Sequence, residues 1–337
     1  MRIHKGYAYD DVLLVPKLSK VSSRKDVSTS IDLGKGIQLS IPIISANMKT
    51  VTGPSLASKL SSLGGMPVLH RFDTVENLIS NFKLSVAGST KPSLIAVSVG
   101  IKEDDYNLAK AFVDEGCRII CIDVAHGHHE RVGNFVRKLR LSTNLHEVLI
   151  MAGNVATSYG AKYLYDAGAD IIKIGIGPSS VCTTRTQTGN GYPQLSALDN
   201  ICNDDFGEFP PFFIADGGIK NSGDCVKALC FADLVMIGNL FAGTDEAPGH
   251  VVSIDGKKYK EYAGSSTYRG KHVEGVSGLV PYVGSLEDVV ERFVDGIKSG
   301  CSYQGVKDLF ALKLSPEFVE ISSAGWAESK PHSIVQV

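Results

Sequence analysis

From residue 42 to residue 238 the sequence repeats one pattern, in which a short apolar run is followed by a segment with helical spacing. The runs are residues 43–48, 66–70, 94–99, 118–124, 148–153, 171–175, 212–216 and 234–238. Each run is apolar throughout rather than at alternate positions, which is typical of parallel strands buried on both faces. Helices are expected at residues 54–63, 106–115, 131–141, 158–167 and 222–231. About eight such units predict an α/β fold closed into a (β/α)8 TIM barrel rather than an open sheet.

The segments on either side of this pattern predict additions to the barrel. Residues 1–40 contain a hairpin around Gly34-Lys35-Gly36 that we expect to act as a lid or plug. After residue 241, Asp255-Gly256 predicts a hairpin between residues 251–254 and 258–262. A polar flap over residues 263–275, a helix over 285–299 and an irregular tail follow. Because no linker is visible, residues 1–337 are expected to form a single domain with a C-terminal flap-and-tail extension.

Composition and charge narrow the class of protein. Hydrophobic residues make up 43% and charged residues 21% of the chain, and no apolar run approaches the roughly 18 residues that a membrane helix needs. The formal net charge of −2 provides no basic surface for nucleic acid. The first residues lack the apolar core of a signal peptide. We therefore expect a cytoplasmic protein that binds a small polar molecule rather than nucleic acid or membrane.

Seven cysteines are present, without the CxxC spacing of a zinc or redox motif. Cys117, Cys121 and Cys230 lie in apolar runs, which is typical of buried free thiols. Cys182 differs, because it follows the strand at residues 171–175 and lies between Ser179-Ser180 and Thr183-Thr184. Amide and hydroxyl donors around a thiol favour its thiolate form. This loop is therefore a candidate for binding an anion and presenting a nucleophile together.

Polar side chains follow most of the predicted strands at their carboxyl ends. They are Asn47, His70, Asp123, Asn154, Cys182, Asp216 and Asn239. TIM-barrel enzymes build their active sites at this face, although any single one of these residues also fits an ordinary turn. The three histidines that follow Asp123, at positions 126, 128 and 129, lack the spacing of a metal-ligand set. Asp123 is better interpreted as a hydrogen-bond acceptor for the ribose or carboxamide of a second ligand.

Two glycine-containing strand ends predict a phosphate site. Asp216-Gly217-Gly218 and Gly238-Asn239 follow the last two strands of the pattern, where bare backbone amides can approach an anion closely. The carboxylate of Asp216 would repel phosphate, so we expect it to accept a hydrogen bond from a ribose hydroxyl. Together with Ser180 in the cysteine loop, these residues favour a nucleoside monophosphate as the ligand.

Seven segments, in order along the chain, resemble one family of purine nucleotide enzymes, which comprises inosine monophosphate dehydrogenase and guanosine monophosphate reductase. They are DDVLLVP at 10–16, SANM at 45–48, AGNV at 152–155, the cysteine loop, ADGGI at 215–219, VMIG at 235–238 and VEG at 273–275. The resemblance implies an eight-stranded barrel, usually in a homotetramer, and a purine nucleotide as substrate. Dehydrogenases usually carry a regulatory insert of CBS type after the second strand, and residues 72–92 are too short for one.

Within the family, the sequence is more similar to the reductases. Between Gly264 and Glu274 there is no room for the long flap whose arginine activates water in the dehydrogenases. Thr184 and Glu274 match the pair that handles ammonia in the reductases, although by spacing alone they also fit a turn and a solvated loop carboxylate. Residues 318–329 instead resemble a dehydrogenase C-terminus. The resemblance implies conversion of GMP to IMP and ammonia with NADPH.

The resemblance also implies roles for individual residues. The catalytic residues it implies are Cys182, expected to attack purine C2, and Thr184 with Glu274, expected to protonate the departing amine. Substrate contacts are expected from Asn47, Met48, Ser180, Asp216, Gly217, Gly218, Gly238, Asn239, Tyr262, Gly264 and Ser265. Cofactor contacts are expected from Asp123, Ala125, Gly153, Asn154 and Thr183. The backbone carbonyls of Gly177, Ser179 and Cys182 are candidates for holding K⁺, as in the dehydrogenases.

Three departures from the family pattern affect these roles. The family's Gly-Pro-Gly-Ser reads Gly177-Pro178-Ser179-Ser180, which bears on cation binding. Ser265 replaces a methionine and Lys271 replaces an arginine, which bear on contacts to the guanine. Two alternatives to the reductase stay open: an IMP dehydrogenase without flap or regulatory insert, and a non-catalytic protein that binds purine nucleotides. No Rossmann fingerprint is present to decide between NADPH and NADH.

Overall fold

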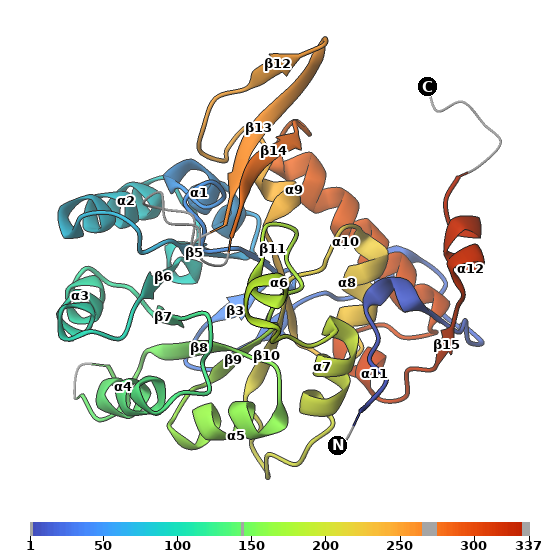
Figure 1. The fold of residues 1–337 in the computed structure, drawn as a ribbon, viewed down its shortest axis with the longest axis horizontal. Helices are drawn as coiled ribbons and strands as arrows, with labels where there is room; N and C mark the ends of the chain where they lie inside the picture. The colour runs from blue at the N-terminus through green and yellow to red at the C-terminus, as the bar shows by residue number, and fades with distance from the viewer. Residues whose placement is uncertain (1–2, 143–144, 265–274, 332–337) are drawn as a thin grey trace.

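A computed structural model describes residues 3–142, 145–264 and 275–331 and confirms the predicted barrel (Figure 1). Eight parallel strands close in the order β10-β11-β4-β5-β6-β7-β8-β9. The strands are β4 (Ile43–Ser45), β5 (Met66–Leu69), β6 (Ala96–Val99), β7 (Ile119–Asp123), β8 (Leu149–Val155), β9 (Ile171–Ile174), β10 (Phe212–Asp216) and β11 (Leu234–Ile237). Each corresponds to one apolar run of the sequence. Their carboxyl ends therefore meet at one face, where a TIM barrel carries its active site.

The helices form the outer layer of the barrel. They are α1 (Pro54–Ser62), α2 (Val75–Ala87), α3 (Glu103–Asp114), α4 (Glu130–Arg140), α5 (Ser158–Asp166), α7 (Gln194–Cys202), α8 (Ser222–Leu229) and α10 (Leu286–Tyr303). The sequence pattern did not predict α2 and α7. Helix α3 begins earlier than expected because the Asp105 carboxylate accepts the Lys102 N–H and caps its first turn. Among the described residues, no helix is long and apolar enough to cross a membrane.

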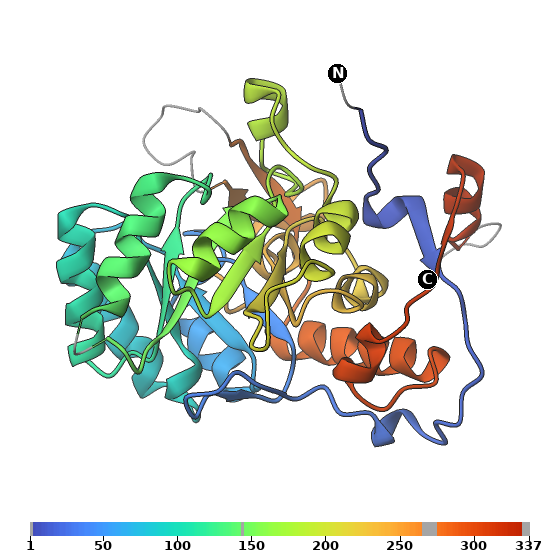
Figure 2. The same cartoon turned by 90° about the horizontal axis from the view of Figure 1, so that it is seen from below.

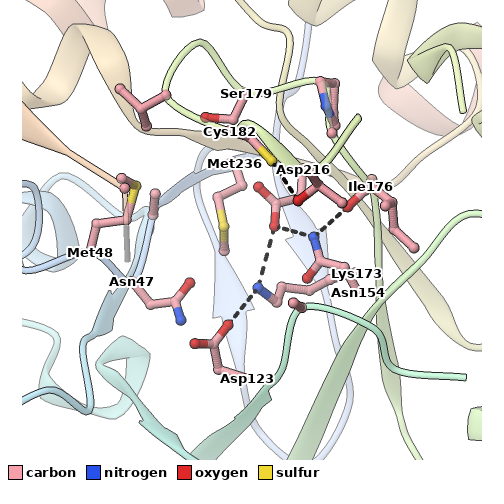
Figure 3. Close-up of a pocket in the computed structure, with 18 of the residues that line it drawn as sticks. Asn47, Met48, Asp123, Asn154, Lys173, Ile176, Ser179, Cys182, Asp216 and Met236 are labelled. Carbon is pink, nitrogen blue, oxygen red and sulfur yellow. Dashed lines mark hydrogen bonds and ion pairs between the residues drawn. The ribbon is translucent and has the colours of Figure 1, made fainter. Parts of the chain in front are cut away.

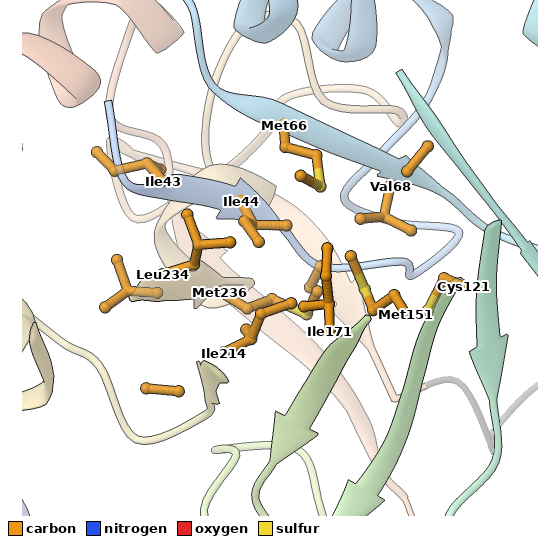
Figure 4. Close-up of a cluster of buried hydrophobic side chains, with 14 of the residues drawn as sticks. Ile43, Ile44, Met66, Val68, Cys121, Met151, Ile171, Ile214, Leu234 and Met236 are labelled. Carbon is orange, nitrogen blue, oxygen red and sulfur yellow. The ribbon is translucent and has the colours of Figure 1, made fainter. Parts of the chain in front are cut away.

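The interior of the barrel is filled by apolar side chains from all sides (Figure 4). Ile44, Met66, Met151, Ile171 and Met236 are at most 2% exposed and pack against one another across the closed sheet. Strands β4, β5, β6, β9 and β11 are buried along their whole length. Burial on both faces explains why the runs are continuously apolar.

The N-terminal hairpin is a plug and not a lid. It consists of β2 (Ile31–Asp32) and β3 (Gln38–Leu39), with Lys35 at its tip. The Lys35 ammonium donates to the Val148 carbonyl and pairs with Asp170, and Arg118 donates to the Lys35 carbonyl. Those partners directly precede β8, β9 and β7, so the hairpin closes the amino end of the barrel, opposite the face with the predicted site.

The C-terminal extension contains one more strand than expected. The predicted hairpin is β12 (Val252–Ile254) and β13 (Lys257–Ala263), and β14 (Ser277–Pro281) adds to it as a third antiparallel strand (Figure 1). Residues 265–274 of the expected flap lie outside the described residues. At the flank of the barrel, β1 (Val12–Leu14) pairs antiparallel with β15 (Phe318–Glu320) (Figure 2). This pairing attaches a segment near the beginning of the chain to one near its end.

Short helical segments complete the chain. They are η1 (Tyr9–Asp11), η2 (Arg24–Asp26), η3 (Pro92–Leu94), α6 (Thr184–Thr188), α9 (Asn239–Ala242), α11 (Leu309–Lys313) and α12 (Ser323–Glu328). Between β5 and β6, where every residue is described, the chain forms only α2 and η3. This connection has the length of an ordinary βα unit.

Candidate active site

A pocket of about 330 Å³ lies at the carboxyl ends of the barrel strands (Figure 3). Its size is within the range of small-molecule sites. Of the residues predicted from the sequence, those lining it are Asn47, Met48, Asp123, Ala125, Asn154, Gly177, Ser179, Cys182, Thr184, Asp216 and Gly264. The fold thus brings together predicted residues from the carboxyl ends of five barrel strands, β4, β7, β8, β9 and β10, and from the end of β13. Ser265 and Glu274 lie outside the described residues.

Cys182 is the cysteine that lines this pocket, and it is partly exposed. Burial raises the pKa of each of the other six thiols. The pKa is raised to about 12 for Cys117, Cys121 and Cys230 and to about 11 for Cys301. It is also raised for Cys202 and Cys225. A thiol held protonated by burial is a poor nucleophile. Cys182 is therefore the candidate nucleophile of the chain.

The Thr184 hydroxyl is a hydrogen-bond partner of that thiol. Thr184 begins α6, and its Oγ1 lies 3.1 Å from the Cys182 Sγ. The backbone of Cys182 forms an antiparallel bridge with Gly275, and Val276 donates its N–H to the Val181 carbonyl at 3.0 Å. The segment that follows residue 274 is thereby attached to the cysteine loop. The thiol, the hydroxyl and this backbone bridge form one unit at the mouth of the pocket.

Arg185 holds the cysteine loop in shape, and sequence reasoning missed it. An added Cβ on Gly177 or Gly191 would lie 2.5 Å or 2.6 Å from the Arg185 Cγ, so the side chain runs between these two backbones. Its guanidinium donates to the Tyr192 carbonyl. Arg185 therefore ties both ends of the loop to α6, which carries Thr184. The only sequence signal was an arginine inside a loop of small residues.

The predicted phosphate residues gather beside the cysteine loop. Asn239 donates from Nδ2 to the Ser180 hydroxyl at 3.3 Å. An added Cβ on Gly238 would lie 2.8 Å from the Tyr262 hydroxyl, and one on Gly217 would lie 2.7 Å from Pro178. Burial raises the pKa of Tyr262, while hydrogen bonds from the side chains at positions 179 and 180 oppose that shift. The phenol is thus protonated at neutral pH and able to donate. Gly218, the next residue after Gly217, has a backbone φ of 80°, which lies in the left-handed region that favours glycine.

Gly175 allows the close approach of β9 and β10 at this end of the barrel. Its φ is 150°, and an added Cβ would lie 2.0 Å from the backbone oxygen of Asp216. We expect Gly175→Ala to lower the free energy of unfolding by about 2–4 kcal/mol, because a backbone atom must move. Gly189→Ala is the control, since its φ is 71° and nothing lies within 4 Å; backbone strain alone should make it lose about 1 kcal/mol. Urea denaturation measures both, and equal losses would contradict this role of Gly175.

Three predicted positions outside the phosphate group do not line the pocket. The predicted phosphate residues are not among the lining residues either; they are Ser180, Gly217, Gly218, Gly238, Asn239 and Tyr262. His70 is 7% exposed, and its Nδ1 accepts the Phe72 N–H, while burial lowers its pKa. It forms a turn, and Arg71 and Phe72 line the pocket instead. Gly153 lies behind the pocket wall, and Thr183 accepts hydrogen bonds from residues 186 and 187 through its carbonyl at the start of α6. Neither position is among the pocket-lining residues.

Lys173 places a cation at the floor of the pocket. Its Nζ lies 3.3 Å from the Asp216 Oδ2 and 3.6 Å from the Asp123 Oδ1 (Figure 3). Asn154 donates to the same Asp216 oxygen and to the Gly175 carbonyl, each at 2.8 Å. The sequence signal was a lysine within the otherwise apolar run of β9, where a charge is tolerated only if it is paired.

A closed parallel barrel with a thiol and a hydroxyl at the end of its sixth strand, beside glycine loops on the seventh and eighth, defines a TIM-barrel enzyme with a cysteine-centred site. Residues 6–332 match the model of the IMP dehydrogenase / GMP reductase domain, and the chain belongs to this family. The resemblance expected from the sequence motifs is thereby confirmed.

Three proteins illustrate the similarity. The chain is 38% identical to the GMP reductase of Staphylococcus carnosus (strain TM300), over 92% of this chain and 94% of that protein. It is 30% identical to the GMP reductase of Leishmania donovani, over 98% and 97% of the two chains. A crystal structure of a cysteine-to-alanine variant of GMP reductase from Trypanosoma brucei, in complex with guanosine 5'-monophosphate, matches with a TM-score of 0.90 and 28% identity over 99% of both chains.

Proposed function

We propose that this chain catalyses the NADPH-dependent reductive deamination of GMP to IMP and ammonia. The observation that carries the proposal is the 3.1 Å contact between the Cys182 thiol and the Thr184 hydroxyl at the mouth of the pocket. Relatives at 38% and 30% identity are GMP reductases, and the similar crystal structure contains guanosine 5'-monophosphate. A nucleophile beside a proton donor is the arrangement that covalent displacement of an amine requires.

GMP would bind with its phosphate against the cysteine loop and the glycine loops of β10 and β11. The donors there are Ser180, Asn239 and the phenol of Tyr262, together with the backbone amides of residues 217, 218 and 238. Asp216 accepts from the ribose hydroxyls. The purine then lies between Met48 and Cys182, with Asn47, Gly264 and Ser265 assigned to its polar edges. Met48 is 9% exposed and offers an apolar wall, which suits a flat aromatic base.

The chemistry proceeds in two steps at purine C2. The Cys182 thiolate forms an S–C2 bond as the C2–N bond to the amino group breaks, and the amine leaves as ammonia after taking a proton from Thr184 and Glu274. Glu274 precedes Gly275 in the chain, and the Gly275 backbone is bridged to Cys182. In the second step a hydride adds to C2, the S–C2 bond breaks and the thiolate is restored. Each step has an activated intermediate, which a direct displacement lacks.

The residues of the other half of the pocket fit a nicotinamide cofactor. When bound, NADPH supplies the hydride. Asp123, Ala125 and Asn154 line the pocket, and we assign them to this half. The Asn154 Nδ2 already donates to the Gly175 carbonyl and to Asp216, so the Asp123 carboxylate and the Asn154 amide oxygen are the acceptors left for ribose hydroxyl or carboxamide N–H groups. Gly153 and Thr183 were expected to contact the cofactor, and neither lines the pocket. We assign Gly153 to the support of the floor and Thr183 to the start of α6.

We extend the proposal to the assembly and to a monovalent cation. The resemblance supports a single catalytic domain in a cytoplasmic homotetramer, and the short connection between β5 and β6 is consistent with the lack of a regulatory insert. Carbonyl oxygens of Gly177, Ser179 and Cys182 are hard donors that suit K⁺. The Ser179 carbonyl already accepts the Cys182 N–H at 3.1 Å, which leaves one lone pair for an ion.

One assay decides between this function and its two alternatives. Purified protein with GMP and NADPH should consume NADPH, followed by its absorbance, in equal amount to the IMP formed. With IMP and NAD⁺ it should form no NADH over repeated turnovers, because the water-activating flap of a dehydrogenase does not fit between residues 264 and 274. NADH formation with IMP, without GMP-dependent loss of NADPH, would overturn the proposal in favour of a dehydrogenase. Binding of GMP without any turnover would favour a non-catalytic protein.

A further inference from the structure

The barrel carries one ammonium between two pocket carboxylates, and neither the sequence motifs nor the relatives assign it a role. Lys173 is 1% exposed, and its Nζ lies between Asp216 and Asp123 (Figure 3). An added Cβ on Gly153 would lie 2.7 Å from the Lys173 Cβ, so the glycine of the neighbouring strand leaves room for the stem of the lysine. The side chain is held in place along its length, with its charge directed at the pocket floor.

The two carboxylates depend on this ammonium to different degrees. Asp123 has a second cation, the Arg71 guanidinium, whose Nε lies 3.5 Å from Oδ2. For Asp216, Lys173 is the one cation within 4 Å among the residues that the structure describes. Asn154 supplies a neutral donor to the same oxygen, Oδ2. With Oδ2 engaged by Lys173 and Asn154, the other oxygen of Asp216 is the one left to accept from a ligand.

The ammonium keeps its charge in this buried position. Burial by itself would lower the pKa of Lys173, but the carboxylate of Asp216, the Cys121 thiol and the carboxylate of Asp123 raise it, and the net shift is upward. A charged donor holds an acceptor more firmly than a neutral one does. Removing it would leave two carboxylates facing one cavity without their shared cation.

We propose that Lys173 is a positioning residue that holds Asp216 as an ionised, correctly oriented acceptor for the ribose of the nucleotide. The lysine does not touch the reacting atoms. The inference rests on the proposed function, which assigns the ribose to Asp216. The bridge from Asp216 through Lys173 to Asp123 also makes the floor of the nucleotide half and the floor of the cofactor half one connected unit.

The test compares the effect of Lys173→Met on the dissociation constant for GMP in two variants. Each variant lacks one of the two carboxylates that Lys173 contacts. In Asp123→Asn, adding Lys173→Met leaves Asp216 without a cation, and the dissociation constant for GMP should rise at least about 10-fold. In Asp216→Asn, the same Lys173→Met change should alter it by less than about 3-fold, because the acceptor that Lys173 positions is already gone. GMP binding is measured by calorimetry without NADPH, after thermal melting has shown that each variant is folded.

Equal losses in the two backgrounds would overturn the inference, since a lysine with only a structural role weakens binding whichever carboxylate remains. Both double variants retain a single carboxylate beside the missing cation, which makes them less prone to unfold than Lys173→Met alone. Because the readout is binding, it is separate from the proposed function. A wild-type protein that binds GMP but does not oxidise NADPH refutes the reductase activity and leaves this comparison valid.

Discussion

Cys182→Ala should lower turnover of GMP by at least about ten-thousand-fold, because Cys182 is the one thiol among the described pocket-lining residues and the proposed S–C2 bond cannot form without it. The dissociation constant for GMP should change by less than about 3-fold, since the phosphate and ribose residues are untouched. Steady-state oxidation of NADPH measures the first quantity, and calorimetry with GMP measures the second. Mass spectrometry of quenched enzyme should detect a purine adduct in the wild type and none in the variant.

The matched control for this prediction is Cys202→Ala on α7. Burial raises the pKa of that thiol, and it does not line the pocket, so turnover should stay within about 2-fold of wild type. A loss of activity in Cys202→Ala as large as that in Cys182→Ala would indicate a general effect of removing cysteines. Retained turnover in Cys182→Ala would contradict covalent catalysis at this residue.

The fold was predictable because the barrel strands are buried on both faces. Eight continuous apolar runs predict eight parallel strands, as the structure has them. The glycines and polar residues that follow these runs predict a site at the carboxyl face of the barrel. Helices α2 and α7 were missed, and the sequence of α2, VENLISNFKLSVA, mixes apolar residues with serine and asparagine. The third strand of the extension, β14, pairs with β13 across a long connection, which local patterns do not reveal.

The floor of the site was less predictable than its rim. Asp123 and Asp216 were identified because they end β7 and β10, and Cys182 because it lies among small and hydroxyl residues in the loop after β9. Lys173 and Arg185 act through side chains that reach across to other strands or loops, so their roles depend on tertiary distances such as the 3.3 Å between Lys173 and Asp216. Sequence spacing carries no information about such distances.

Thr184→Val should separate the two chemical steps. Valine keeps the shape of threonine but removes the hydroxyl that lies 3.1 Å from the Cys182 thiol. Protonation of the departing amine is then lost. We expect kcat with GMP to fall about 100- to 1000-fold, which is a typical rate contribution of a general acid. Thr184→Ser keeps the hydroxyl and is the matched control, with kcat expected within about 10-fold of wild type. Both variants should bind GMP as the wild type does.

The rate of the second step can be measured separately, and it distinguishes a specific role of Thr184 from a general disturbance of the site. A disturbed site would slow the second step as well as the first. By reversibility, IMP and NADP⁺ form the covalent Cys182 intermediate and one equivalent of NADPH without ammonia, so no amine has to be protonated or released. Rapid mixing should therefore show a single-turnover burst of NADPH in Thr184→Val at nearly the wild-type rate, while GMP turnover is lost. Equal losses of the burst and of GMP turnover would mean that Thr184 only supports the position of Cys182. A preserved burst instead assigns Thr184 to the deamination step, which is the step that separates this chemistry from that of a dehydrogenase.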